Sequence, residues 1–202
     1  VSAVYNAPPR NSFVAALRDI PEIWEISYDP KVKIYKGMVH TYNEDNPEGL
    51  AEKGPFPVRQ IVLDDYLDDF FFDLDYRNLI GAARNAKNGQ VVNMNVGRKI
   101  ADIDLAGMPH LGSGITWNYE GNPVLATPHL KGGQVSVINM KDWSTVKIIN
   151  TKGPGFFMRS HENTPYAWVD VFFGPNKDLM HIINKRTLEI VKTIRPVPGK
   201  TA

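Results

Sequence analysis

The 202-residue chain contains no cysteine. This absence excludes disulfide bonds, thiolate metal sites and the covalent attachment of a c-type haem within these residues. Nor does any apolar run approach the roughly 20 residues that a membrane-spanning helix needs. The sequence therefore predicts no membrane span, and its lack of cysteine is compatible with any cellular compartment.

The chain also lacks an excess of charge of either sign. It has 23 basic and 22 acidic residues, which gives a net charge of +1. Proteins that bind nucleic acid or a membrane surface concentrate basic residues in patches, whereas the basic residues here are scattered. We therefore expect neither nucleic acid nor a membrane as a partner. The hydrophobic content of 43% is typical of a globular domain.

What the chain does contain is a repeat. Three segments share an apolar run, an asparagine, a short polar break and a second alternating run: Gln90–Leu105, Gln134–Asn150 and Leu179–Arg195. We align their asparagines as Asn95, Asn139 and Asn184, which are about 45 residues apart. Two further runs precede each copy: Phe70–Phe72 and Asn78–Ala83, Ile115–Trp117 and Pro123–Thr127, and Phe156–Met158 and Tyr166–Phe172. Each unit thus holds four short strands, which is typical of a β-propeller blade.

The repeat predicts an all-β fold, and its period-2 alternation argues against a solenoid of helices. Residues 1–202 hold roughly three and a half blades, since the segment Ser12–Val39 matches the repeat poorly. Known propellers close with about four to eight blades, so we interpret the chain as part of a larger ring. We expect Asp29–Pro57 to be the longest loop, with an irregular strand in part of Val32–Tyr42 and no helix longer than one turn anywhere.

Three histidines lie beside predicted inner strands of two neighbouring blades. His110 precedes an innermost strand, His129 ends a second strand, and His161 follows an innermost strand. Inner strands line the axial channel of a propeller, where an imidazole can move protons or ligate a metal. These three are our candidate catalytic residues. The alternative for each is an ordinary hydrogen-bonded loop side chain, which is what we expect for His40 and His181.

A second group of residues suits the binding of a flat anionic ligand. In the segment GPGFFMR at residues 153–159, Phe157 or the phenylalanine before it can offer a flat apolar face, and Arg159 can bind a carboxylate through two hydrogen bonds. Arg84 and Asn85 follow a second strand two blades earlier and are candidates for the same purpose. The alternative is a turn with core aromatics and a surface arginine. No metal site is predicted, because Asp64, Asp65, Asp68 and Asp69 lack the spacing of a calcium loop.

Four strings together resemble the cytochrome d1 domain, the eight-bladed propeller of cytochrome cd1 nitrite reductase and its relatives. They are DDFFFD (68–73), GMPHLGSGITW (107–117), LATPHLK (125–131) and GFFMRSHENTPYAWVD (155–170). The resemblance covers residues 1–202, is strongest over residues 63–202, and is closest to the dihydro-haem d1 dehydrogenase branch. It implies that the chain is about half of an eight-bladed d1-type propeller.

The resemblance also implies a cofactor and roles for individual residues. The family holds haem d1 in the axial channel, with arginines on the acidic side chains of the macrocycle and histidines over its distal face. His110 and His129 resemble the two distal histidines of the nitrite reductase, whereas His161 has no clear counterpart. Arg84 and Arg159 lie in segments that resemble those facing the cofactor. The proximal iron ligand and the haem c domain of the family are expected outside residues 1–202.

The function implied by the resemblance is that of a periplasmic oxidoreductase that binds haem d1. Oxidation of dihydro-haem d1 during haem d1 biosynthesis is the first choice, with a histidine as the base. The first alternative is reduction of nitrite to nitric oxide, with His110 and His129 as proton donors. The second is a non-catalytic haem d1 carrier or scaffold, because one fold supports many functions. Either enzyme implies a c-type cytochrome or another electron-transfer partner.

Overall fold

The structure, a computed structural model, describes residues 1–32, 35–39, 48–51, 55–105 and 107–202. His40 lies outside the described residues, whereas the irregular strand expected in part of Val32–Tyr42 is confirmed as β4 (Tyr35–Val39), whose pairing shifts in register between Tyr35 and Met38. Within them the chain is almost entirely β-structure, and its helices are two single 3-10 turns, η1 (Pro8–Arg10) and η2 (Leu111–Ser113). The expected absence of longer helices is therefore confirmed for the described part of the chain.

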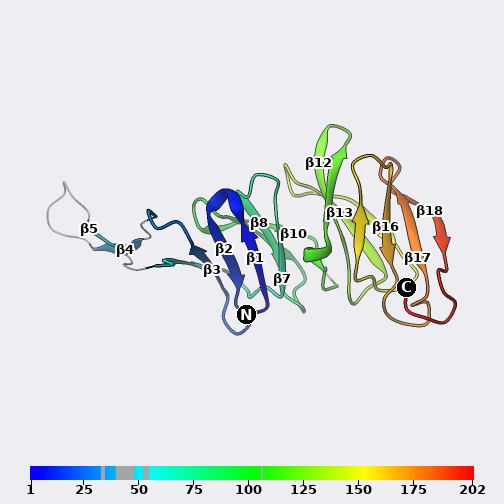
Figure 1. Cartoon of the computed structure of the whole chain (residues 1–202), viewed down its shortest axis with the longest axis horizontal. Helices are drawn as coiled ribbons and strands as arrows, with labels where there is room; N and C mark the ends of the chain where they lie inside the picture. The colour runs from blue at the N-terminus through cyan, green and yellow to red at the C-terminus, as the bar shows by residue number, and fades with distance from the viewer. Residues whose placement is uncertain (33–34, 40–47, 52–54, 106) are drawn as a thin grey trace.

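Sixteen of the strands form four antiparallel sheets of four strands each, which we call blades 1 to 4. Blade 1 contains β1 (Ala3–Ala7), β2 (Ser12–Ala16), β3 (Glu22–Ser27) and β6 (Val58–Val62); blade 2 contains β7 (Asp69–Phe72), β8 (Asn78–Ala82), β9 (Gly89–Asn93) and β10 (Arg98–Ile103). Blade 3 contains β11 (Ile115–Tyr119), β12 (Asn122–Pro128), β13 (Gln134–Asn139) and β14 (Thr145–Asn150); blade 4 contains β15 (Met158–Ser160), β16 (Tyr166–Asp170), β17 (Met180–Asn184) and β18 (Glu189–Ile194). The blades follow one another in chain order along the long axis of the molecule (Figure 1).

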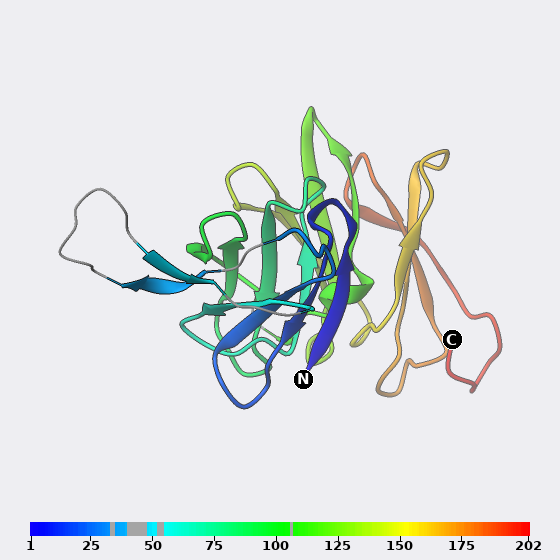
Figure 2. The same cartoon turned by 60° about the vertical axis from the view of Figure 1, so that its left-hand side comes forward.

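Blade 1 differs from our sequence-based expectation of about half a blade. The chain leaves it after β3, forms a separate two-stranded sheet from β4 (Tyr35–Val39) and β5 (Glu48–Ala51), and returns as β6. In Figures 1 and 2 this hairpin extends away from the four blades. The inserted hairpin interrupts the repeat in the sequence, although β6 still pairs with β3 and completes a fourth sheet.

Blades 2 to 4 share one turn between the third and fourth strands. The third strands β9, β13 and β17 are equivalent, as the sequence predicts, but the asparagine equivalent to Asn139 and Asn184 is Asn93 and not Asn95. In each blade this asparagine Oδ1 accepts the N–H two residues later, and its carbonyl accepts the N–H four residues later. The last residue of each turn has a positive φ: Gly97 (67°), Trp143 (65°) and Leu188 (56°). An asparagine favours this turn because its short side chain satisfies the freed backbone N–H.

Apolar side chains fill the three spaces between neighbouring blades. One cluster joins blades 1 and 2 through residues such as Val14 and Phe70, a second joins blades 2 and 3, and a third joins blades 3 and 4 through residues such as Val124 and Ala167. The middle blades are covered on both faces, so β9 and β13 contain continuous buried runs, whereas β3 alternates between buried and partly exposed residues. This packing fixes each blade against its neighbours and so places the first strands of the blades, which we call the inner strands, beside one another.

Candidate functional site

One cavity of about 400 Å³ lies where the inner strands begin. Its wall receives residues from all four blades, among them Tyr5, Arg18, Asp68, Arg84, His110 and Phe156. Tyr5 lies on β1, Asp68 and Arg84 flank β7 and β8, His110 precedes β11, and Phe156 precedes β15. We call this space the His110 cavity. Its volume is in the range of small-molecule sites, which usually combine apolar walls with a few polar groups.

His110 is held in one orientation by the loop before β15. Its Nδ1 lies 2.5 Å from the carbonyl oxygen of Phe156, and the Phe156 ring packs on the imidazole with centroids 4.2 Å apart. A carbonyl oxygen only accepts hydrogen bonds, so Nδ1 carries the proton in this contact. Nε2 makes no hydrogen bond with any described residue and, in a neutral ring, has a free lone pair. His110 is thus arranged as a proton acceptor or ligand at the cavity wall.

Arg84 is anchored beside Asp68 at the same cavity. Its backbone N–H donates to Asp68 Oδ2 at 2.5 Å, and a guanidinium nitrogen lies 3.5 Å from Asp68 Oδ1. The Arg84 side chain is 41% exposed, so this ion pair is weak. Its Nε is buried and has no partner among the described residues. An incoming carboxylate would supply that partner and form a charge-assisted hydrogen bond.

Tyr5 and Asp69 connect three blades at the edge of the cavity. The Tyr5 hydroxyl donates to Asp69 Oδ1 at 2.8 Å, and Asp69 Oδ2 accepts the N–H of Gly112 at 2.7 Å. Burial, followed by the charge of Asp69 and this hydrogen bond, raises the pKa of Tyr5 well above its ordinary value. The phenol therefore stays protonated around neutral pH and acts as a hydrogen-bond donor that aligns β1 with β7.

Arg18 is a cavity residue that sequence reasoning missed. It lies just after β2, is exposed, and has no hydrogen bond or ion pair with any described residue. Together with Arg84 it gives the cavity two guanidinium groups, which suit the bidentate binding of carboxylates. The repeat in the sequence offered no signal for it, because blade 1 matches the other blades poorly.

His129 lies inside blade 3 and does not line the His110 cavity. Its side chain is fully buried, Nε2 bonds to the Ser136 hydroxyl at 2.9 Å, and Gln134 Nε2 donates to Nδ1 at 3.3 Å. Its backbone pairs with Pro109, so the two segments are adjacent. The structure therefore brings His110, but not His129, to the cavity, and the catalytic role of His129 stays a prediction.

Unlike Arg84, the other three candidate binding residues are not among those that line the cavity. Phe157 follows the cavity residue Phe156 and is 49% exposed, with its ring centroid 6.4 Å from that of His110. The Arg159 guanidinium donates to the Met158 carbonyl at 2.7 Å. Asn85 accepts a hydrogen bond from Lys131 Nζ at 2.6 Å through its side-chain oxygen. The binding roles of these three residues stay predictions.

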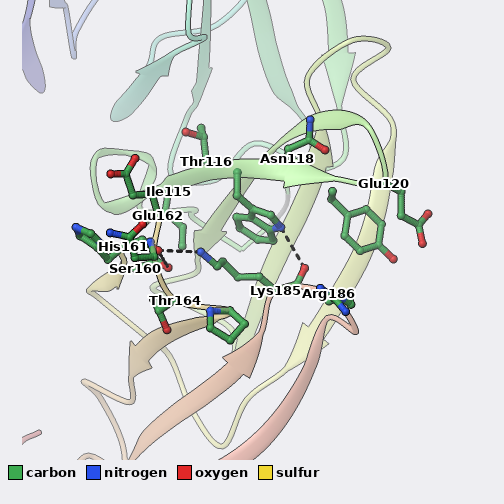
Figure 3. Close-up of a pocket in the computed structure, with 14 residues that line it drawn as sticks. Ile115, Thr116, Asn118, Glu120, Ser160, His161, Glu162, Thr164, Lys185 and Arg186 are labelled. Atoms are coloured by element: carbon green, nitrogen blue, oxygen red, sulfur yellow. Dashed lines mark hydrogen bonds between the residues drawn. The ribbon is translucent and has the colours of Figure 1, made fainter.

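His161 lines a different and larger cavity, of about 780 Å³, at the far ends of β11 and β15. In Figure 3, His161 and Ser160 lie on one side of it, and the Lys185 ammonium donates to the His161 carbonyl at 3.0 Å. The exposed His161 ring accepts the N–H of Asn163 through Nδ1 at 3.1 Å. Because His110 and His161 line separate cavities, they do not form one site in this structure, and the role of His161 stays a prediction.

The described residues hold neither a membrane-spanning helix nor a cluster of metal ligands. Among these residues there is no helix with the length and apolar character needed to span a membrane. The same residues contain no group of three or more His, Cys, Asp or Glu side chains arranged to hold a metal ion.

Comparison with known proteins identifies the family. Residues 50–202 match the model of the Cytochrome D1 heme domain. Over all 202 residues the chain is 46% identical to the dihydro-heme d1 dehydrogenase of Pseudomonas aeruginosa, of which it covers 36%. It is also 26% identical over 128 residues to a nitrite reductase of Stutzerimonas stutzeri, covering 56% of this chain and 23% of that protein. The chain thus spans only about a third or less of the length of these relatives.

Solved structures support the same fold. The chain matches dihydro-heme d1 dehydrogenase NirN in complex with DHE at a TM-score of 0.83 and 45% identity, covering 100% of this chain and 38% of that one. A hydrazine synthase of Kuenenia stuttgartiensis shares the fold alone, with a TM-score of 0.66 at 8% identity over 94% of this chain and 47% of that one. The predicted all-β propeller fragment is thereby confirmed.

Proposed function

The chain belongs to the Cytochrome D1 heme domain family, and from this premise we propose that it forms part of an oxidoreductase that oxidises dihydro-haem d1. The observation that best supports this proposal is the arrangement of the His110 ring. Its Nδ1 is fixed by the Phe156 carbonyl, while its Nε2 has no partner among the described residues. The reaction fits a role in haem d1 biosynthesis.

The described residues fit an anionic tetrapyrrole. Phe156 offers an aromatic face, Arg18 and Arg84 offer guanidinium groups, and Arg84 Nε is a buried donor with no described partner. Stacking and charge-assisted hydrogen bonds are the interactions that a flat macrocycle with carboxylate substituents requires. At about 400 Å³ the cavity suits one edge of the macrocycle rather than the whole of it. We propose that its acidic substituents contact Arg84 and Arg18, with Phe157, Arg159 and Asn85 at the periphery.

Dehydrogenation of a carbon–carbon single bond removes two protons and two electrons. We propose that Nε2 of His110 accepts one proton as the electrons leave the tetrapyrrole, and that the second proton passes to water. The two electrons pass to a c-type cytochrome or another one-electron carrier, which is reduced twice per turnover. The conjugated macrocycle supplies the redox chemistry, and the protein supplies orientation and the base. We also propose a periplasmic location, which the resemblance to the cytochrome d1 family implies.

The test uses the full-length protein with His110→Gln and, as matched control, His161→Gln from the other cavity. Oxidation of dihydro-haem d1 is followed by absorption spectroscopy, and binding is measured separately by titration. Because a general base contributes about 10²- to 10⁴-fold, His110→Gln should slow oxidation at least about a hundredfold while binding is retained. His161→Gln should stay within about twofold of the wild type.

Oxidation by His110→Gln at the wild-type rate would remove His110 as the base. A loss of rate in His129→Gln or His161→Gln alone would assign the role to that residue instead. Nitrite consumption is followed in parallel. Turnover of nitrite but not of dihydro-haem d1 would establish the reductase, and stoichiometric binding of haem d1 without turnover of either would establish the carrier.

A further inference from the structure

A buried carboxylate, Asp170, lies at the end of β16 and binds the loop that contacts His110. It is 4% exposed, and its Oδ1 accepts the backbone N–H groups of Phe156 at 2.7 Å and Phe157 at 2.9 Å. The N–H of Asp170 donates in return to the Phe157 carbonyl at 3.2 Å. Its Oδ2 is buried without a hydrogen-bond partner among the described residues. A buried carboxylate oxygen without a partner is costly, which indicates a role for Asp170 beyond packing.

The loop that Asp170 binds has little room to move. The N–H of Gly155 donates to the His129 carbonyl at 3.1 Å, so three successive N–H groups of the loop are bonded. A Cβ at Gly155 would lie 2.8 Å from the Asp170 carbonyl oxygen and 3.2 Å from the Pro128 side chain. Only glycine therefore lets the loop lie this close to β12 and β16.

The same loop determines which nitrogen of His110 carries the proton. The Phe156 carbonyl belongs to the segment that Asp170 fixes, and it accepts the Nδ1–H of His110 at 2.5 Å. His129 is held in the opposite way, because Gln134 donates to its Nδ1 and its Nε2–H donates to Ser136. These two histidines, whose segments are adjacent, are thus predicted to be opposite tautomers.

Electrostatics couples Asp170 to the same site. Burial raises the pKa of Asp170, whereas the N–H groups of Phe156 and Phe157 and, more weakly, the charge of His110 act in the opposite direction. Asp170 is not among the residues that line the His110 cavity, so its contact with the site runs through the loop.

We propose that Asp170 is a positioning residue that fixes the orientation and the Nδ1–H tautomer of His110 through the peptide groups of Phe156 and Phe157. Its consequence for catalysis rests on the proposed function, because the free Nε2 is the proposed base. The geometry is that of a carboxylate that orients a histidine, with a peptide group interposed between the two.

The first test reads the tautomers in the wild type. The full-length protein is labelled with ¹⁵N only at histidine, and long-range ¹H–¹⁵N correlation spectra are recorded at mildly alkaline pH, where imidazoles are neutral. Loss of signals in His110→Gln and His129→Gln assigns the two rings. We expect Nδ1–H for His110 and Nε2–H for His129, which serves as the internal control. An Nε2–H tautomer for His110 overturns the proposal without any Asp170 variant.

The second test removes the carboxylate. Asp170→Ala should leave the loop without its acceptor, so that His110 populates both tautomers and oxidation of dihydro-haem d1 slows about tenfold or more. Asp170→Asn keeps an oxygen acceptor and should keep the Nδ1–H signal. If Asp170→Ala does not fold, Asp170→Glu, which displaces the carboxylate by one methylene, takes its place with the same expectation.

Asp178→Ala is the matched control for the loss of a buried acid in blade 4. Asp178 Oδ2 accepts the N–H of Gly199 at 2.8 Å and lies 3.1 Å from Arg195 Nε, away from the His110 loop. Asp178→Ala should lower the stability of the protein without changing the His110 tautomer or the rate of dihydro-haem d1 oxidation. A folded Asp170→Ala with an unchanged tautomer and rate contradicts the proposal. Absence of turnover with the expected tautomers contradicts the proposed function alone.

Discussion

Glu25 is expected to hold blades 1 and 2 together, and its replacement by alanine tests how these blades are joined. The Glu25 side chain, on β3, is 9% exposed and receives Arg10 Nε at 2.6 Å and an Arg59 guanidinium nitrogen at 3.7 Å. Both arginines also reach blade 2: Arg10 donates to Asn95 Oδ1 at 2.8 Å, and Arg59 donates to the Asn95 carbonyl at 3.1 Å. Glu25→Ala would leave two largely buried cations without their carboxylate.

The expected loss follows from that geometry. Removing one partner of a buried ion pair costs about 3–5 kcal/mol, because the remaining charge is left desolvated and unpaired. Lys99→Ala is the matched control, since Lys99 contacts Asp64 at 2.6 Å and Asp102 at 2.7 Å but both carboxylates are well exposed. Exposed pairs of this kind are worth up to about 1 kcal/mol.

Urea unfolding followed by tryptophan fluorescence measures both losses, and Trp24 on β3 reports directly on blade 1. Glu25→Ala should lower the free energy of unfolding by at least about three times as much as Lys99→Ala. Equal losses would show that Glu25 acts like a surface charge and does not hold blades 1 and 2 together.

Three further outcomes are expected. Burial and the charge of Lys152 lower the pKa of His181 from 6.5, so the stability that neutral His181 contributes is complete above pH 6.5 and is lost as the pH falls toward the pKa of the folded state. The free energy of unfolding should therefore fall between pH 7 and 5, by at most about 1.4 kcal/mol per pH unit. Urea unfolding should show a smaller fall in His181→Asn. Glu120 and Gly121 both have positive φ, 49° and 81°, so Glu120→Asn should raise the melting temperature through a gain of about 0.5–1 kcal/mol, and a lower one would contradict the strain. Arg84→Ala should weaken binding of dihydro-haem d1 about tenfold in a spectroscopic titration, whereas unchanged binding would place the carboxylates elsewhere.

The sequence predicted those parts of the fold that repeat. Val135–Ile138 and Met180–Ile183 are parts of equivalent third strands because apolar runs and turn residues recur at a constant interval. The alignment of the shared asparagine was wrong by two residues in blade 2, where Asn93 makes the turn. Blade 1 was not predicted as a complete blade, because its fourth strand is separated from the third by an inserted hairpin.

The candidate site was predictable only where a local string marks it. His110 was found because its string and its place before an inner strand are both visible in one segment. Tyr5 was missed because its part depends on a contact between blades, with Asp69 across 64 residues. Arg18 was missed because blade 1 matches the repeat poorly. Asp170 was missed because its part depends on the N–H groups of Phe156 and Phe157, which the pairing of β15 with β16 brings to it. His129 was expected to face the channel from its place at a strand end, but its ring turns into blade 3, where Ser136 and Gln134 accept and donate the hydrogen bonds that it needs.

The structure of the full-length protein with bound dihydro-haem d1 would test the proposed site most directly. We expect one edge of the macrocycle in the His110 cavity, with His110 Nε2 facing the tetrapyrrole and Arg84 within hydrogen-bond distance of a carboxylate. A macrocycle bound in the cavity beside His161, or one that leaves Arg84 and His110 without contact, would contradict the assignment.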